Sequence, residues 1–212
     1  MKHKLFDKLI KCSSIGMMVF VTCLPAVSAE EYTEATYKKM GVFLSNFTET
    51  GLRNFESSEL NDTPEGNEQI INFAIKHLRI NTPKKYESYA GEYGLLHGKA
   101  GNNDLTEVIF RYFGFKNFLP PADQVLEKIL PSYDKKSDSW EVHEYTLDLA
   151  EYVKVTKISP AKDDRLDVEG YTYYPDLDNK KGSKCTAVVA PHSFSKQYKW
   201  EIVSLHCDPY NL

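Results

Sequence analysis

The side chains best suited to acid–base or metal chemistry in this chain are the histidines beyond residue 29. They are His77, His97, His143, His192 and His206. No two of them have the spacing of a metal-binding pair, and on a strand the adjacent His143 and Glu144 would point to opposite faces. We therefore predict no metal site and no cofactor. His97 lies in Gly-Leu-Leu-His-Gly, which favours a loop, so it is the histidine that we expect to be most exposed.

Nucleophilic catalysis and glycan hydrolysis have no specific signal in the sequence. There is no Gly-x-Ser-x-Gly turn, and the adjacent His192 and Ser193 make no triad by themselves. A carboxylate pair for sugar hydrolysis could be drawn from Asp134, Asp138, Glu141 or Glu144. Such pairs arise by chance in a chain with 30 acidic residues, so we expect a solvated acidic face instead.

Aromatic side chains offer a different kind of chemistry, the binding of a ligand by stacking and apolar burial. On one predicted strand, Tyr171 and Tyr173 share a face and Tyr174 takes the other. If a concave sheet face is incompletely covered, Trp140, Tyr171, Tyr173 and His97 are our candidate ligand-binding residues. The ligand would be a protein or glycan at the cell surface. The alternative is that these rings are the core of a sheet packed on helices.

Two function classes therefore remain. The leading hypothesis is an exported, non-enzymatic binding or accessory protein, because the chain offers aromatic surface and no catalytic motif. The alternative is a hydrolase of cell-wall glycan or peptide, with acidic residues and a histidine brought together only in the fold.

The cysteines favour a disulfide. Cys12 and Cys23 fall in the first 29 residues, which leaves Cys185 and Cys207. If residues 184–190 and 198–206 are strands joined by a three-residue loop at 195–197, Cys185 and Cys207 face each other. We predict that they are bridged, which would stabilise the fold by roughly 3 kcal/mol. Two unpaired thiols are the alternative.

The first 29 residues predict export. Four lysines at positions 2, 4, 8 and 11 precede an apolar run over residues 15–24, and the segment ends Ala-Val-Ser-Ala. This order is typical of a secretory signal peptide. We expect cleavage after Ala29 and a secreted or cell-surface protein. A lipoprotein site at Cys23 would need a small residue before it, and Thr22 matches poorly.

Net charge excludes some partners. The first 29 residues carry four lysines and one aspartate, so the chain's net charge of −4 leaves −7 on residues 30–212. An acidic body without a basic stripe is a poor partner for nucleic acid or anionic lipid. No later apolar run approaches the ~18 residues of a membrane span.

Apolar periodicity predicts helices in the first part of the chain. Spacings of three and four predict helices over residues 36–50, 64–81 and 104–113, and prolines bracket a short helix at 122–130. Asp104 and Glu107 resemble a capping box, and Gly114 ends that helix. Its residues Leu105, Ile109 and Phe113 should be buried.

Alternating apolar residues predict four or five antiparallel strands from about residue 140, at 141–147, 152–158, 167–174, 185–190 and 198–206. The fold class is therefore α+β, with N-terminal helices packed on a curved C-terminal antiparallel sheet, as in a cystatin-like or NTF2-like half-cone. We expect one domain over residues 30–212, helical over about 36–131 and sheet over about 140–207.

Four blocks of sequence resemble a known group of proteins. They are YKKMGVFLSNFTE (37–49), IINFAIKH (70–77), IFRYFG (109–114) and AVVAPHSF with WEIVSL (187–194 and 200–205). They look like an uncharacterised family of exported, often lipid-anchored proteins of Gram-positive gut bacteria. The resemblance implies a secreted or surface location and brings no assigned reaction or functional residue. This chain departs from the lipid-anchored members at Thr22-Cys23.

Overall fold

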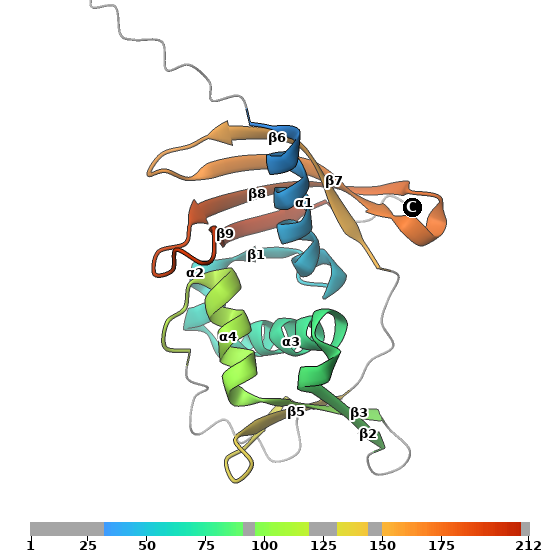
Figure 1. Cartoon of the computed structure of the whole chain (residues 1–212), viewed down its shortest axis with the longest axis vertical. Coiled ribbons are helices and arrows are strands. Elements are labelled where there is room, and N and C mark those ends of the chain that lie inside the picture. Colours follow the sequence, from blue (N-terminus) through green and yellow to red (C-terminus); the bar gives the residue numbers. More distant parts are fainter. Residues whose placement is uncertain (1–31, 91–95, 119–130, 144–149, 209–212) are drawn as a thin grey trace, which may run out of the picture. The chain divides into compact units, whose positions relative to one another are not determined.

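A computed structural model describes residues 32–90, 96–118, 131–143 and 150–208, and its class is α+β (Figure 1). Helices pack on two antiparallel sheets, where the sequence predicted a single sheet. The predicted signal peptide at 1–29 and the predicted helix at 122–130 lie outside the described residues. Among the residues that the structure describes, no helix is long and apolar enough to cross a membrane.

The larger sheet has five strands in the order β1-β9-β8-β7-β6. Their bounds are β1 Asn54–Glu56, β6 Tyr152–Pro160, β7 Leu166–Tyr174, β8 Lys180–Pro191 and β9 Trp200–Cys207. Alternate residues point into the core, among them Val153, Val168, Ala187 and Ile202. Apart from β1 and the first five residues of β8, these strands are close to the predicted ones, because period-two alternation is strong where one face is buried.

Helix α1 (Glu34–Glu49) lies along β6, at the edge of this sheet (Figure 1). Two of its side chains make hydrogen bonds to the backbone at this edge, where a further strand would otherwise pair. Ser45 Oγ accepts the backbone N–H of Val153 at 2.9 Å, and Thr48 Oγ1 donates to the carbonyl of Glu151 at 2.6 Å. A Cβ on Gly41 would lie 2.8 Å from the Val153 carbonyl oxygen, so glycine allows the close approach. The helix thus covers an edge that would otherwise be open to pairing.

Helix α2 (Ser57–Asp62) is followed by α3 (Pro64–Asn81), whose bounds match the prediction. Thr63 is its N-cap and accepts the N–H of Gly66 at 3.0 Å, with proline at the first helical position.

Helix α4 (Asn102–Phe113) ends at Gly114, whose φ of 72° is left-handed, as predicted. The predicted capping box is wrong, because the N-cap is Gly101, which has no side chain to accept a helix N–H. Leu105, Ile109 and Phe113 are buried as expected.

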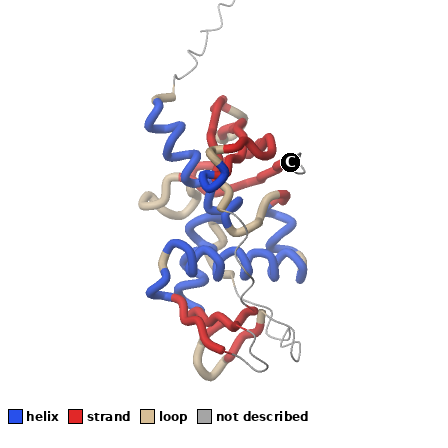
Figure 2. Tube along the Cα trace, turned by 90° about the vertical axis from the view of Figure 1, so that its right-hand side faces the viewer, coloured by secondary structure: helices blue, strands red, loops and turns tan. Residues whose placement is uncertain are grey.

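The smaller sheet was not anticipated. Its order is β2-β3-β5-β4, with bounds β2 Tyr86–Ala90, β3 Leu96–Gly101, β4 Ser132–Asp134 and β5 Ser139–His143. Two of its four strands, β2 and β3, lie in the part predicted to be helical, and only β5 overlaps a predicted strand, the one at 141–147. The four strands are short and rich in polar residues and glycine. α4 contacts both β9 and β3, so it joins the two groups of strands, which Figure 2 shows in red.

Cys185 and Cys207 form a disulfide and are directly paired across β8 and β9, which confirms the prediction. The predicted three-residue loop is wrong: the strands end at Pro191 and restart at Trp200, and a bulge at Val188/Val189 shifts the register beyond the cysteines. The two cysteines thus face each other as predicted although the loop is longer than predicted, because the bulge lies between the loop and the cysteine pair.

Candidate functional site

The four candidate ligand-binding residues do not come together. Trp140 and His97 belong to the smaller sheet, and Tyr171 and Tyr173 to β7 of the larger one. Trp140 is only 4% exposed and donates from Nε1 to Asn102 Oδ1 at 3.1 Å, so it is part of the core. Tyr171 and Tyr173 are partly exposed and are not members of the core cluster. For these two tyrosines, the alternative that they are core residues is excluded.

The strand register builds an exposed surface around the two tyrosines, which we call the Tyr–Lys face. Its members are Tyr152, Lys154, Tyr171, Tyr173, Lys181 and Lys184. Residues directly opposite each other on antiparallel strands share a face. Tyr152 and Lys181 lie opposite Tyr173, on either side of it. Lys154 and Lys184 flank Tyr171 in the same way.

Side-chain contacts tie this face together. Lys181 Nζ lies 4.4 Å from the centre of the Tyr171 ring, a cation–π distance. The Tyr152 and Tyr173 rings are 5.9 Å apart. Partial burial, with Glu49 nearby, raises the pKa of Tyr152 above its ordinary value, so its hydroxyl stays protonated and can donate a hydrogen bond.

Thr172, between the two tyrosines, points inward and is fully buried. The β7–β8 register shifts between Tyr171 and Tyr173, and the Thr172 hydroxyl accepts the N–H of Ser183 there at 2.7 Å. A Cβ on Gly182 would lie 2.4 Å from this hydroxyl oxygen, so only glycine fits beside it. A buried hydroxyl thus fixes the irregularity on which the positions of Tyr171 and Tyr173 depend.

Glu151 anchors the strand beside Tyr152 in a similar way. Its side chain is 2% exposed and pairs with Arg53. Tyr174 Oη also donates to Glu151 Oε1 at 2.9 Å. A buried carboxylate is tolerated when it is paired and hydrogen-bonded in this way. The inward neighbours of the Tyr–Lys face are therefore held by specific polar contacts.

Charge on the Tyr–Lys face is one-sided. Lys154, Lys181 and Lys184 are exposed, and within the described ranges no ion pair joins them to a carboxylate. Glu169 marks the end of the cluster, because it pairs with Lys157 at 2.6 Å. The face is thus a small basic, aromatic surface on a chain of net charge −4.

A second cluster joins His97, Glu141 and Tyr89 on the smaller sheet. His97 lies on β3 and not in the predicted loop, and its side chain is only 15% exposed. Its Nδ1 donates to Glu141 Oε1 at 2.9 Å, and the Tyr89 hydroxyl donates to the same oxygen. The bonds from Tyr89 and His97 lower the pKa of Glu141, and burial with the bond to Glu141 raises that of Tyr89. Sequence reasoning missed this cluster because Tyr89 and His97 lie on strands that were not predicted.

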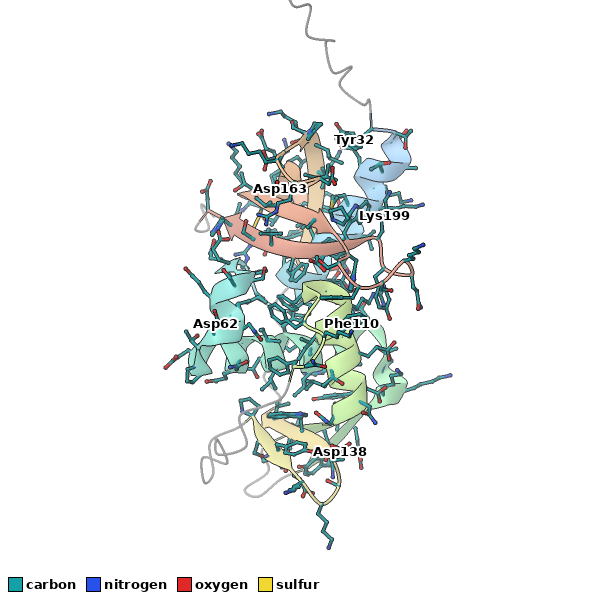
Figure 3. All side chains as sticks on the ribbon, turned by 90° about the vertical axis from the view of Figure 1, so that its left-hand side faces the viewer. Tyr32, Asp62, Phe110, Asp138, Asp163 and Lys199 are labelled. Carbon is teal, nitrogen blue, oxygen red and sulfur yellow. A yellow bond between two sulfur atoms is a disulfide. The ribbon has the colours of Figure 1, made fainter. Side chains whose placement is uncertain are left out.

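His192 and Ser193 do not form a catalytic pair. His192 is buried against Phe110, which is labelled in Figure 3. Its Nε2 donates to the carbonyl of Phe110 at 2.9 Å, and its Nδ1 accepts the N–H of Phe194 at 3.3 Å. Ser193 Oγ donates to Glu201 at 2.7 Å. Both ring nitrogens and the hydroxyl have structural partners, so this histidine anchors the β8–β9 loop to α4.

His77 is a buried histidine of α3. It packs between the rings of Phe73 and Tyr112, and Asn81 Nδ2 donates to its Nδ1 at 3.1 Å. Burial, with a contribution from the charge on Arg111, lowers the pKa of His77 to about 4. Burial also raises the pKa of Glu49, a residue that Asn81 contacts as well. His77 is neutral at physiological pH and is part of the core.

Across the described part of the chain, no three His, Cys, Asp or Glu side chains are grouped so that they could hold a metal ion. Comparisons with protein-family models, with curated proteins and with solved structures find no match for this chain. The function must therefore be argued from the site geometry.

The sequence contained a partial signal for the Tyr–Lys face. Tyr152 and Lys154 alternate with Val153 and Val155, so they could be assigned to an outward face. Their position beside Tyr171 and Tyr173 depends on the strand register, which alternation alone does not set.

Proposed function

We propose that this protein is an exported, non-enzymatic binding or accessory protein of the cell envelope or extracellular space, and that it contacts its ligand through the Tyr–Lys face. One observation carries the proposal: Tyr171 and Tyr173 lie outside the core, on a sheet face that also bears three exposed lysines. The signal-like N-terminus and the resemblance to exported proteins of Gram-positive bacteria support the location. Helix α1 on the larger sheet is compatible with a cystatin-like or NTF2-like half-cone, which remains part of the proposal.

Partly exposed tyrosines suit recognition better than stability. A tyrosine ring offers a rigid apolar surface and a polar hydroxyl, and few rotatable bonds lose their freedom when a ligand binds. On the Tyr–Lys face the rings gain little from the core, because they lie outside it. A ligand that covered them would bury apolar area and could bond to the tyrosine hydroxyls and lysines at its rim.

Retention on cell envelopes tests the proposal. We expect purified protein to sediment with isolated envelopes, and a Tyr171→Ala/Tyr173→Ala variant to stay in the supernatant. Phe194→Ala is the matched control, because Phe194 is a 60% exposed ring with Lys116 Nζ 5.4 Å from its centre. Equal retention of the double variant and the wild type would refute the proposed site.

Export is tested by N-terminal sequencing of the protein recovered outside the cytoplasm. We expect a chain that begins at Glu30. A lipid-bearing chain that begins at Cys23 would show that the lipoprotein alternative is right.

The hydrolase alternative has one observation in its favour, the hydrogen bond from His97 to Glu141. A carboxylate that orients an imidazole is a common part of acid–base sites. Its test is the release of sugar reducing ends or peptide amines from purified cell wall. Release that Glu141→Gln abolishes and Glu107→Gln leaves intact would favour the hydrolase; no release favours the binding protein.

A further inference from the structure

The Tyr–Lys face also indicates the chemical class of its ligand, an inference that rests on the proposed function. We infer that the ligand is an anionic polysaccharide. Its sugar rings would lie on Tyr171 and Tyr173, and its acidic groups would meet Lys154, Lys181 and Lys184. The positive charge of this face carries the inference, because no ion pair joins its lysines to a carboxylate among the described residues and the neighbouring Glu169 is paired with Lys157.

The arrangement of the cations suits a chain ligand. Lys154 and Lys184 lie on β6 and β8, on opposite sides of Tyr171. Neighbouring strands are about 4.8 Å apart, so the backbones of these two lysines are separated by roughly 10 Å across the sheet. A ligand that reaches both must cross the Tyr171 ring. Acidic groups separated by a sugar ring meet this requirement, whereas a single small anion does not.

Lysine is a point charge with three hydrogen-bond donors, and it suits isolated carboxylate or phosphate groups. The face has no arginine, whose planar fork favours bidentate recognition of one acidic group. The tyrosines add stacking surface for sugar rings. These residue types together favour a polymer that is partly apolar and rich in hydroxyl groups, and whose acidic groups are separated by sugar rings.

Densely charged polyanions fit less well. Double-stranded DNA carries one charge per ≈1.7 Å of its axis, and the remaining surface of this acidic chain would repel it. Glu169, next to the face, would also meet such a polymer. An anionic membrane would be repelled over a wide area by the same acidic surface around the face. A polysaccharide with one acidic group per sugar could contact the lysines alone.

Calorimetric binding measurements with defined probes test the inference. The purified protein is titrated with polygalacturonate, neutral dextran, phosphatidylglycerol vesicles and a single-stranded oligonucleotide. We expect binding to polygalacturonate that weakens with added salt, and weak or no binding to the other three. A Lys154→Gln/Lys181→Gln/Lys184→Gln variant should bind polygalacturonate about tenfold more weakly. Lys38→Gln/Lys39→Gln/Lys196→Gln is the control, because it removes the same charge from exposed positions elsewhere and should bind as the wild type does.

Several results would overturn the inference. Tighter binding to vesicles or to the oligonucleotide would identify a different ligand class. An equal loss in both lysine variants would reduce the effect to net charge, and no binding to polygalacturonate would also contradict the inference. If dextran bound as well as polygalacturonate, with the Tyr171→Ala/Tyr173→Ala loss of envelope retention intact, the inference would fall and the proposed binding function would stand.

Discussion

The two faces of β7 place similar residues in opposite environments. The inward side chains, Val168, Thr172 and Tyr174, are each no more than 3% exposed, and both polar ones have hydrogen-bond partners. The outward side chains Tyr171 and Tyr173 are partly exposed and lie outside the core. The inner face thus determines whether the sheet forms, and the outer face is available to bind a ligand.

The largest effect should come from the inner face. Ile202, on β9, is 1% exposed, so Ile202→Ala loses transfer free energy and leaves a cavity. We expect a loss of about 3 to 4 kcal/mol in the free energy of unfolding by urea. Val188→Ala is the matched control on the outward, partly exposed side of β8 and should cost much less. Equal losses would remove the distinction between the faces.

The disulfide should come next. Cys185 and Cys207 are 22 residues apart in sequence, and replacing both with alanine should cost about 3 kcal/mol, because the unfolded chain loses a constraint. The measurement is urea unfolding of the variant and of the wild type with and without reductant. Reduced wild type should match the variant closely. Two titratable thiols in the untreated native protein would contradict the bridge.

Acid should destabilise the core through His77. Its pKa is about 4 in the folded protein and 6.5 without burial, so between these values the unfolded chain binds more protons. The stabilisation is complete above pH 6.5 and is lost as the pH falls toward 4, by roughly 2 to 3 kcal/mol. The raised pKa of Glu49 acts in the opposite direction and offsets part of the loss. His77→Gln should flatten the pH profile of unfolding; an unchanged slope would assign the acid sensitivity to other groups.

Thr172→Val sharpens the comparison, because it changes the inner face while both outer tyrosines remain. Valine keeps the shape but cannot accept the Ser183 N–H, so we expect a loss of about 1 to 2 kcal/mol in unfolding free energy. Weaker envelope retention should accompany this loss, since the hydroxyl fixes the register shift beside Tyr171. Full stability with full retention would show that the bulge does not depend on it.

Different parts of the molecule were predictable to different degrees. α3 could be predicted closely because a cap, a proline and an apolar stripe coincide over residues 63–81. The cysteine pairing was predicted from a three-residue loop that the structure does not have, and it holds because the bulge at Val188/Val189 shifts the register to the predicted one at residues 185 and 207. The smaller sheet could not be predicted, because short strands such as Ser132–Asp134 carry no periodic signal.

The site shows the same limit. The sequence identified Tyr171 and Tyr173 as sharing a face, but the lysines beside them depend on pairings between strands far apart in the chain. The grouping of Trp140 and His97 with these tyrosines was wrong, because no local pattern indicated that the strands divide into two sheets. Contacts of this kind are set by tertiary pairing and not by local propensity.

The most direct test of the two-face interpretation measures stability and binding on one variant, Tyr171→Ala/Tyr173→Ala. Because both rings lie outside the core, we expect the free energy of unfolding to change by about 0.5 kcal/mol per substitution or less, while retention on cell envelopes is lost. A stability loss as large as that of Ile202→Ala, or unchanged retention, would contradict the assignment of the outer face to ligand binding.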